Sequence, residues 1–215
     1  MNQPLALMTR KTRLSTRTTL LAAALALASL TSACVPLIVG GAAVGGAMVA
    51  TDRRTTAMQL EDKTIEVKAS NRIKELVGDK HHVNVNSYNR RVLLTGEVFQ
   101  DNDREAIAQA VAKVENVKGV VNETVKDWPS SLSQRSNDQL IEGKVKATFV
   151  DAKGLPANAF SIIVERGVVY LMGRVTEAEA TQAVDLTRTI SGVQKVVKVL
   201  EIVSPTELLA PVEKR

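Results

Sequence analysis

The sequence predicts an α+β protein that contains two tandem copies of one small domain, each in the order α-β-β-α-β. Segment 92–98, VLLTGEV, is matched 77 residues later by segment 169–175, VYLMGRV. Two further pairs recur 76 residues apart, 65–73 with 141–149 and 114–121 with 190–197. A repeat of this length is a domain with its own small core rather than one turn of a solenoid.

Each element of the first copy has its own signal. Ile65, Ala69, Ile73 and Leu76 recur at helical spacing and predict a first helix with these side chains buried. Alternating apolar residues around Val83 and Val85 predict a strand, a turn follows, and 92–98 is the second strand. An acidic residue opens segment 101–114, which predicts a second helix, and 117–128 is the third strand.

The second copy fills the same positions. Ile141, Val145 and Phe149 predict its first helix, and 160–175 reads as two strands joined by a turn at ERG. A helix over 176–190 and a strand over 193–203 complete the copy. In each copy we therefore expect two helices to cover one face of a three-stranded mixed sheet.

A secretory leader precedes both copies. Residues 1–33 carry four basic and no acidic residues, followed by an apolar segment at 18–30 that is too short to span a membrane. Small residues then lead to Cys34, the only cysteine, so a disulfide within the chain is excluded. The stretch resembles the lipobox of bacterial lipoproteins, in which the cysteine becomes the acylated first residue. The alternative is a buried or incidental cysteine.

Removal of the leader changes the charge of the protein. Without its four basic residues, 24 basic residues remain against 23 acidic ones, a net charge of +1. The basic character of the full sequence, +5, is therefore mostly a property of the leader. This argues against a nucleic-acid-binding protein, which needs a basic surface.

A segment rich in Gly and Ala, residues 35–50, follows Cys34. It is short for a membrane span, and its two Gly-Gly pairs weaken a helix. We interpret it as an apolar tether near the lipid surface, and the alternative is a segment buried against a partner. The expected organisation is a signal peptide at 1–33, lipidated Cys34 and tether at 34–60, domains at 61–128 and 136–203 with a linker at 129–135, and a tail at 204–215.

The two copies resemble BON domains, and the whole chain resembles the dual-BON outer-membrane lipoproteins. The resemblance rests on the segments LLTGEV and YLMGRV, on the closing strands GVVNE and KVVKV, and on the lipobox with its Gly/Ala-rich tail. It implies a lipid-anchored protein on the periplasmic face of the outer membrane. Val35 agrees with that location, because inner-membrane lipoproteins typically carry Asp after the cysteine.

The resemblance implies that the protein binds anionic phospholipid, supports envelope integrity and contacts the outer-membrane protein assembly machinery. In this family the lipid-contacting surface is attributed to the first helix of the second domain. Leu140, Lys144 and Lys146 lie outside the predicted buried seam of that helix and are the candidate lipid-binding residues. Two acidic residues in the same stretch, Asp138 and Glu142, offset the lysines. The alternative is an ordinary solvated helix face with one stray leucine.

Catalysis has little support in the sequence. His81 and His82 are the only histidines, and we expect them at the solvent-exposed end of a strand rather than in a catalytic or metal site. No nucleotide-binding, nucleophile-elbow or zinc-protease motif occurs, and helix capping explains the scattered carboxylates. We expect no cofactor and no enzymatic activity. The main rival function is a scaffold that binds proteins of the envelope through a strand edge or helix face.

Three further residues carry expectations. Gly96 and Gly173 align across the repeat, and we interpret them as structural positions where a side chain would collide with a covering helix or distort the strand, rather than as ligand sites. Trp128, the only tryptophan, precedes the linker, and we expect it to fasten the two domains together rather than to stack on a ligand.

Overall fold

The structure, a computed structural model, describes residues 52–78 and 81–209. The predicted leader, Cys34 and most of the tether lie outside the described residues. All of the described residues belong to one unit of the chain, residues 48–215. Among the helices of the described ranges, none combines the length and the apolar character that a membrane crossing requires.

The first copy folds as predicted, with two helices on a mixed sheet. Strand β1 runs antiparallel to β2, and β3 and β4 run parallel to β2. The bounds are α4 Thr56–Val77, β1 His82–Tyr88, β2 Arg91–Val98, α5 Asp101–Ala112, β3 Gly119–Asn122 and β4 Val125–Lys126.

The second copy has the same order with a regular three-stranded sheet, β5-β6-β7. Strand β5 is antiparallel and β7 parallel to the central β6. The bounds are α6 Leu132–Asp151, a short 3-10 turn η2 Ala157–Ala159, β5 Phe160–Glu165, β6 Val168–Val175, α7 Glu177–Arg188, β7 Lys195–Ile202 and α8 Pro205–Leu209. The α+β class and the tandem repeat are thus confirmed.

The last strand of the first copy differs in detail from the prediction, because it is split into β3 and β4. The side-chain oxygen of Asn122 accepts hydrogen bonds from the amide and the hydroxyl of Thr124, which turns the backbone away from the ladder. The Glu123 amide still donates to the Leu94 carbonyl, and pairing with β2 resumes at Val125.

Side-chain caps explain where the long helices begin. The Thr55 hydroxyl accepts from the Met58 amide ahead of α4. Reciprocal capping boxes, Ser131 with Gln134 and Thr176 with Glu179, start α6 and α7. Both long helices begin earlier than the predicted domain starts, α4 at Thr56 and α6 at Leu132.

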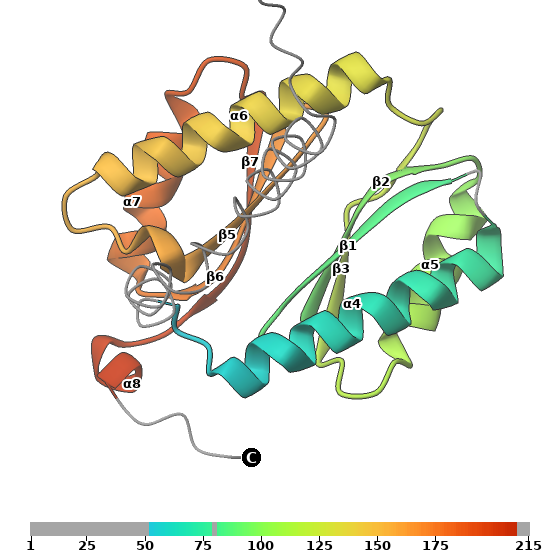
Figure 1. The fold of residues 1–215 in the computed structure, drawn as a ribbon, viewed down its shortest axis with the longest axis horizontal. Helices are drawn as coiled ribbons and strands as arrows, with labels where there is room; N and C mark the ends of the chain where they lie inside the picture. Colours follow the sequence, from blue (N-terminus) through green and yellow to red (C-terminus); the bar gives the residue numbers. More distant parts are fainter. Residues whose placement is uncertain (1–51, 79–80, 210–215) are drawn as a thin grey trace, which may run out of the picture. The chain divides into compact units, whose positions relative to one another are not determined.

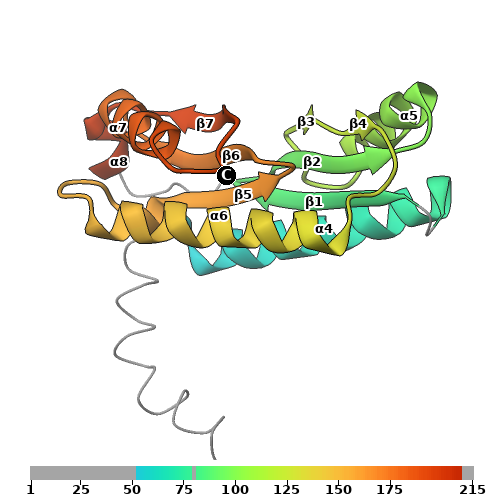
Figure 2. The ribbon, with the colours of Figure 1, turned by 90° about the horizontal axis from the view of Figure 1, so that it is seen from above.

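Each pair of helices covers one face of its own sheet, as Figures 1 and 2 show for α6 and α7 and for α4 and α5. Alternate residues of the central strands face these helices, such as Leu94 in the first core and Leu171 in the second. The intervening residues form a third cluster between the two sheets, made of Tyr88, Leu93, Tyr170, Met172 and Val199. The two BON-like copies therefore share a core along their uncovered faces.

Two expectations about apolar side chains were wrong. Leu76 is 49% exposed, because Ile73 and Val77 occupy the inward positions of the last turn of α4 and leave Leu76 on its outer side. Trp128 is 77% exposed, and its ring packs edge-on against Phe99 of the same copy at 5.2 Å. Tyr88, Tyr170 and their neighbours in the third cluster connect the two copies instead.

Candidate functional site: the outward face of helix α6

Helix α6 is anchored by one face. Ile141, Val145 and Phe149 are buried as predicted, and the Phe149 ring meets Phe160 of β5 at a centroid distance of 5.2 Å. This contact fixes the rotation of the helix about its axis. The opposite face is therefore held toward solvent.

Asp138 belongs to the buried side of α6 rather than to the candidate surface. Its side chain is 5% exposed and accepts hydrogen bonds of 2.8 Å from the amides of Arg166 and Gly167 in the β5–β6 turn. The expectation that Asp138 offsets the lysines of the outward face was therefore wrong. Asp62 of α4 plays the corresponding part in the first copy, where its carboxylate accepts hydrogen bonds from the amides of Asn89 and Arg90 in the β1–β2 turn.

The outward face of α6 presents an apolar stripe. Leu140 is 65% exposed, and Leu132 and Val150 are still more exposed at 81% and 72%. Exposed Gly143 and Ala147 lie between them, and the spacing 132, 140, 143, 147, 150 follows one side of an α-helix. Sequence reasoning found Leu140 but missed Leu132 and Val150, although this same spacing was available in the sequence.

The two candidate lysines differ in their surroundings. Lys144 is exposed beside Leu140 and has no ion-pair partner among the described residues. Lys146 forms an ion pair with Glu142 one turn earlier on α6. The structure thus brings Leu140 and Lys144 together on one surface and leaves Lys146 largely compensated.

The aligned glycines are packing positions, with a different neighbour from the one expected. A Cβ atom at Gly173 would come within 2.5 Å of the Ala159 carbonyl oxygen, and one at Gly96 would overlap the carbonyl oxygen of His82. Gly96 also has a φ of +100°, which favours glycine. The obstacle is the neighbouring backbone, not a covering helix.

The histidines do not lie at an open strand end. The His82 side chain is 19% exposed, and its Nδ1 lies 2.9 Å from Oε2 of the fully buried Glu97. The His81 ring packs against Phe99 at 4.8 Å. The expectation of solvent-facing histidines was therefore wrong, and Glu97 is a buried carboxylate that capping does not explain.

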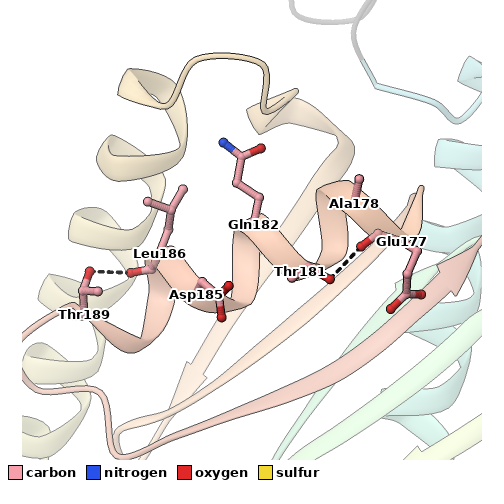
Figure 3. A pocket seen from close by; sticks show the side chains of 7 residues that line it. All are labelled: Glu177, Ala178, Thr181, Gln182, Asp185, Leu186 and Thr189. Atoms are coloured by element: carbon pink, nitrogen blue, oxygen red, sulfur yellow. Dashed lines mark hydrogen bonds between the residues drawn. The ribbon is translucent and has the colours of Figure 1, made fainter.

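A shallow hollow follows the outward side of α7, and Figure 3 shows the seven side chains along it. They come from α7 and its C-cap residue Thr189, and the Thr181 and Thr189 hydroxyls donate to backbone carbonyls of the same helix. Among the described residues, no side chain from a second element lines it. We therefore do not regard this hollow as a binding site.

Comparison with known proteins agrees with the fold. A BON domain model matches residues 61–125 and 137–204. This chain belongs to the BON family. Both BON domains coincide with the two repeats, so the helix with the apolar stripe is the first helix of the second BON domain.

Several relatives share most of this BON pair. The outer membrane lipoprotein DolP of Haemophilus influenzae is 41% identical over 172 residues, covering 78% of this chain and 88% of that protein. A 21 kDa hemolysin of Actinobacillus pleuropneumoniae is 27% identical and covers 71% of this chain and 79% of its own length. An uncharacterized protein of Anaplasma centrale is 31% identical over 52% of this chain and 76% of its own length. The dual-BON chain is an outer-membrane lipoprotein, lipid-anchored on the periplasmic face, and the assignment of its acyl chains to Cys34 stays a prediction.

Proposed function

We propose that this protein binds the anionic phospholipid surface of the membrane through the outward face of α6 and in this way supports envelope integrity. The observation that carries the proposal is the exposure of Leu132, Leu140 and Val150 along one side of a helix whose other side is locked into the core. Apolar side chains on a rigid helix beside lysine are typical of interfacial membrane contacts. The role is one of binding rather than catalysis.

The expected strength of this contact is modest. One lysine near an anionic surface contributes about 1 kcal/mol, and Lys144 is the lysine of α6 beside Leu140 that carries no ion pair among the described residues. Burial of a leucine side chain adds about 1.5–3 kcal/mol when it is complete. The contact therefore depends on a membrane that is already close.

The lipid anchor supplies that proximity. Residues 35–51 connect Cys34 to the described part of the chain, a span of at most about 60 Å at about 3.5 Å per residue. A tether of this reach keeps the BON pair at a high effective concentration near the lipid surface. Weak contacts by α6 then become sufficient.

Vesicle flotation tests the proposal. The chain from residue 34 onward, carrying Cys34→Ala so that no acyl chain inserts, is mixed with vesicles of phosphatidylglycerol or of phosphatidylcholine. We expect it to float with the anionic vesicles at low salt, and less so at high salt, where charges are screened. Equal binding to both vesicle types, or none to either, would exclude an anionic-lipid contact.

A protein-binding scaffold is the second candidate, and the sheet of the second BON domain favours it. Within the described residues β7 pairs with β6 alone, which leaves its other edge open, and Ile202 on this strand is 47% exposed. An added strand from an envelope protein, including one of the outer-membrane assembly machinery, would fit such an edge. If flotation fails, we favour this function.

A further inference from the structure

We propose that His82, Glu97 and Glu165 bind a divalent metal ion of the zinc class where the two BON domains meet. One donor atom from each of the three side chains lies within 4.8 Å of the others. An imidazole and two carboxylates are ordinary ligands for Zn²⁺. Neither the fold family nor the proposed lipid contact requires this site.

The three residues are brought together by strand register and by the contact between domains. His82 of β1 is the direct partner of Glu97 on β2 in the antiparallel ladder, so their side chains emerge on the same face. Glu165 ends β5 of the second domain and approaches this face from the opposite sheet. The sequence separates these residues too widely for a metal-binding spacing to be recognised.

His82 and Glu97 are close enough to share an ion after a small adjustment. Their Nδ1 and Oε2 atoms are 2.9 Å apart, and a tetrahedral Zn²⁺ with bonds of about 2.0–2.2 Å needs its neighbouring donor atoms roughly 3.4 Å apart. The ion would replace the proton that these two atoms share. Arg166 and the Ser130 amide hold Glu97 in place at 3.2 Å, which fixes the direction of its carboxylate.

Glu165 is a buried carboxylate that forms no salt bridge with a lysine or arginine among the described residues. It is 6% exposed, and its one hydrogen bond among the described contacts comes from the neutral amide of Asn84 at 2.7 Å. Buried carboxylates in proteins are normally paired with a positive charge or bound to a metal ion, so a cation would fit beside Glu165.

A polar cavity of about 510 Å³ gives an ion access to this point. His82 and Glu165 both line it, together with other polar side chains from β1 and α6. The cavity has room for water at the position that three protein ligands leave open on a tetrahedral ion. Because the ligands come from both BON domains, a bound ion would join the two domains.

Titration of zinc into the full-length chain in detergent, after treatment with a chelator, tests this site. We expect one Zn²⁺ per chain by calorimetry and a higher melting temperature with zinc than without it. His82→Gln and Glu165→Gln should each weaken binding at least tenfold. The control is His81→Gln, which changes the adjacent histidine, outside the cluster, and should bind zinc like the unmodified chain.

A measurement on the unmodified chain keeps the test valid if a variant fails to fold. The chain has two histidines, so the ring nitrogens give two sets of nitrogen resonances. Zinc should shift the resonances of His82 and leave those of His81 unchanged. Absence of one-to-one binding, unchanged affinity in both cluster variants, or a zinc-induced shift at His81 instead of His82 would overturn the proposal and show that the cluster is only a polar contact between domains.

Discussion

Single atoms decide the role of the aligned glycines. A methyl group at Gly173 would press on the Ala159 carbonyl oxygen, which belongs to the backbone and has little freedom to move. Gly143, by contrast, lies in the middle of α6, and a methyl group there would meet nothing within 4 Å. The same substitution therefore has opposite effects at these two positions.

We expect Gly173→Ala to lower the free energy of unfolding by about 1–3 kcal/mol through overpacking. Gly143→Ala should raise it by about 0.5–1 kcal/mol, because alanine is the better helix former. Urea unfolding of both variants measures the difference. Two variants of equal stability would show that the β6 backbone yields to the added methyl group.

At this scale the sequence predicted the importance of Gly96 and Gly173 but not their neighbours. Repeat alignment shows that a position is shared, whereas the atom that fills the space depends on strand register. The pairing of His82 with Glu97 escaped prediction for the same reason. Register is a property of two strands and cannot be deduced from the pattern of one.

At the scale of elements, each BON domain ties its first helix to the following hairpin with one buried aspartate. Asp138 holds two amides of the β5–β6 turn, and Asp62 holds the β1–β2 turn in the same way. The two aspartates are 76 residues apart, so the repeat alignment contained this signal. Capping was the wrong interpretation, because both lie within helices.

Loss of the hydrogen bonds between Asp138 and the β5–β6 turn should lower the stability of the protein. Asp138→Ala leaves two turn amides without their acceptor, and we expect the free energy of unfolding to fall by about 1–3 kcal/mol for each amide that remains buried. Asp151→Ala, at the exposed end of the same helix, is the control and should change stability by less than about 0.5 kcal/mol. Thermal unfolding of the two variants compares them. A similar small effect in both would mean that water replaces the aspartate.

At the scale of the whole described unit, the segment before α4 connects the two BON domains. The Arg53 guanidinium makes two hydrogen bonds to the Glu179 carboxylate, at 2.7 and 2.8 Å, and a third to the Arg174 carbonyl. Arg54 donates a hydrogen bond to the Asp62 carboxylate in the first domain. Its guanidinium carbon lies 4.1 Å from the centroid of the Tyr88 ring. Sequence reasoning assigned this connection to Trp128, because a lone tryptophan is conspicuous and a pair of arginines is not.

This connection predicts a pH dependence. Hydrogen bonding to Arg53 lowers the pKa of Glu179 to about 2, so the unfolded chain binds more protons than the folded one as pH falls below about 4.5. The stabilisation is therefore complete at neutral pH and is lost between about pH 4.5 and 2. Glu179→Gln, which retains the helix cap, should be less stable than the parent at pH 7 and equal to it near pH 2. Denaturant unfolding across this range checks the prediction, and a difference that does not vary with pH would contradict it.

The central claim is that the outward face of α6 contacts anionic lipid. It is tested most directly by making that face alone polar and negatively charged. Leu140→Asp with Lys144→Glu alters two exposed positions one turn apart on α6. Val67→Asp with Lys63→Glu makes the same changes at similar spacing on α4, where Val67 is 62% exposed and the Lys63 side chain 75%. Because all four positions are at the surface, both double variants should remain folded.

Partition of the two double variants onto phosphatidylglycerol vesicles at low salt is the deciding measurement, made with the unacylated chain from residue 34. We predict at least a tenfold loss of binding for the α6 variant and less than a twofold change for the α4 variant. Equal losses would show a contact without preference for α6, and full retention by the α6 variant would contradict the proposed function.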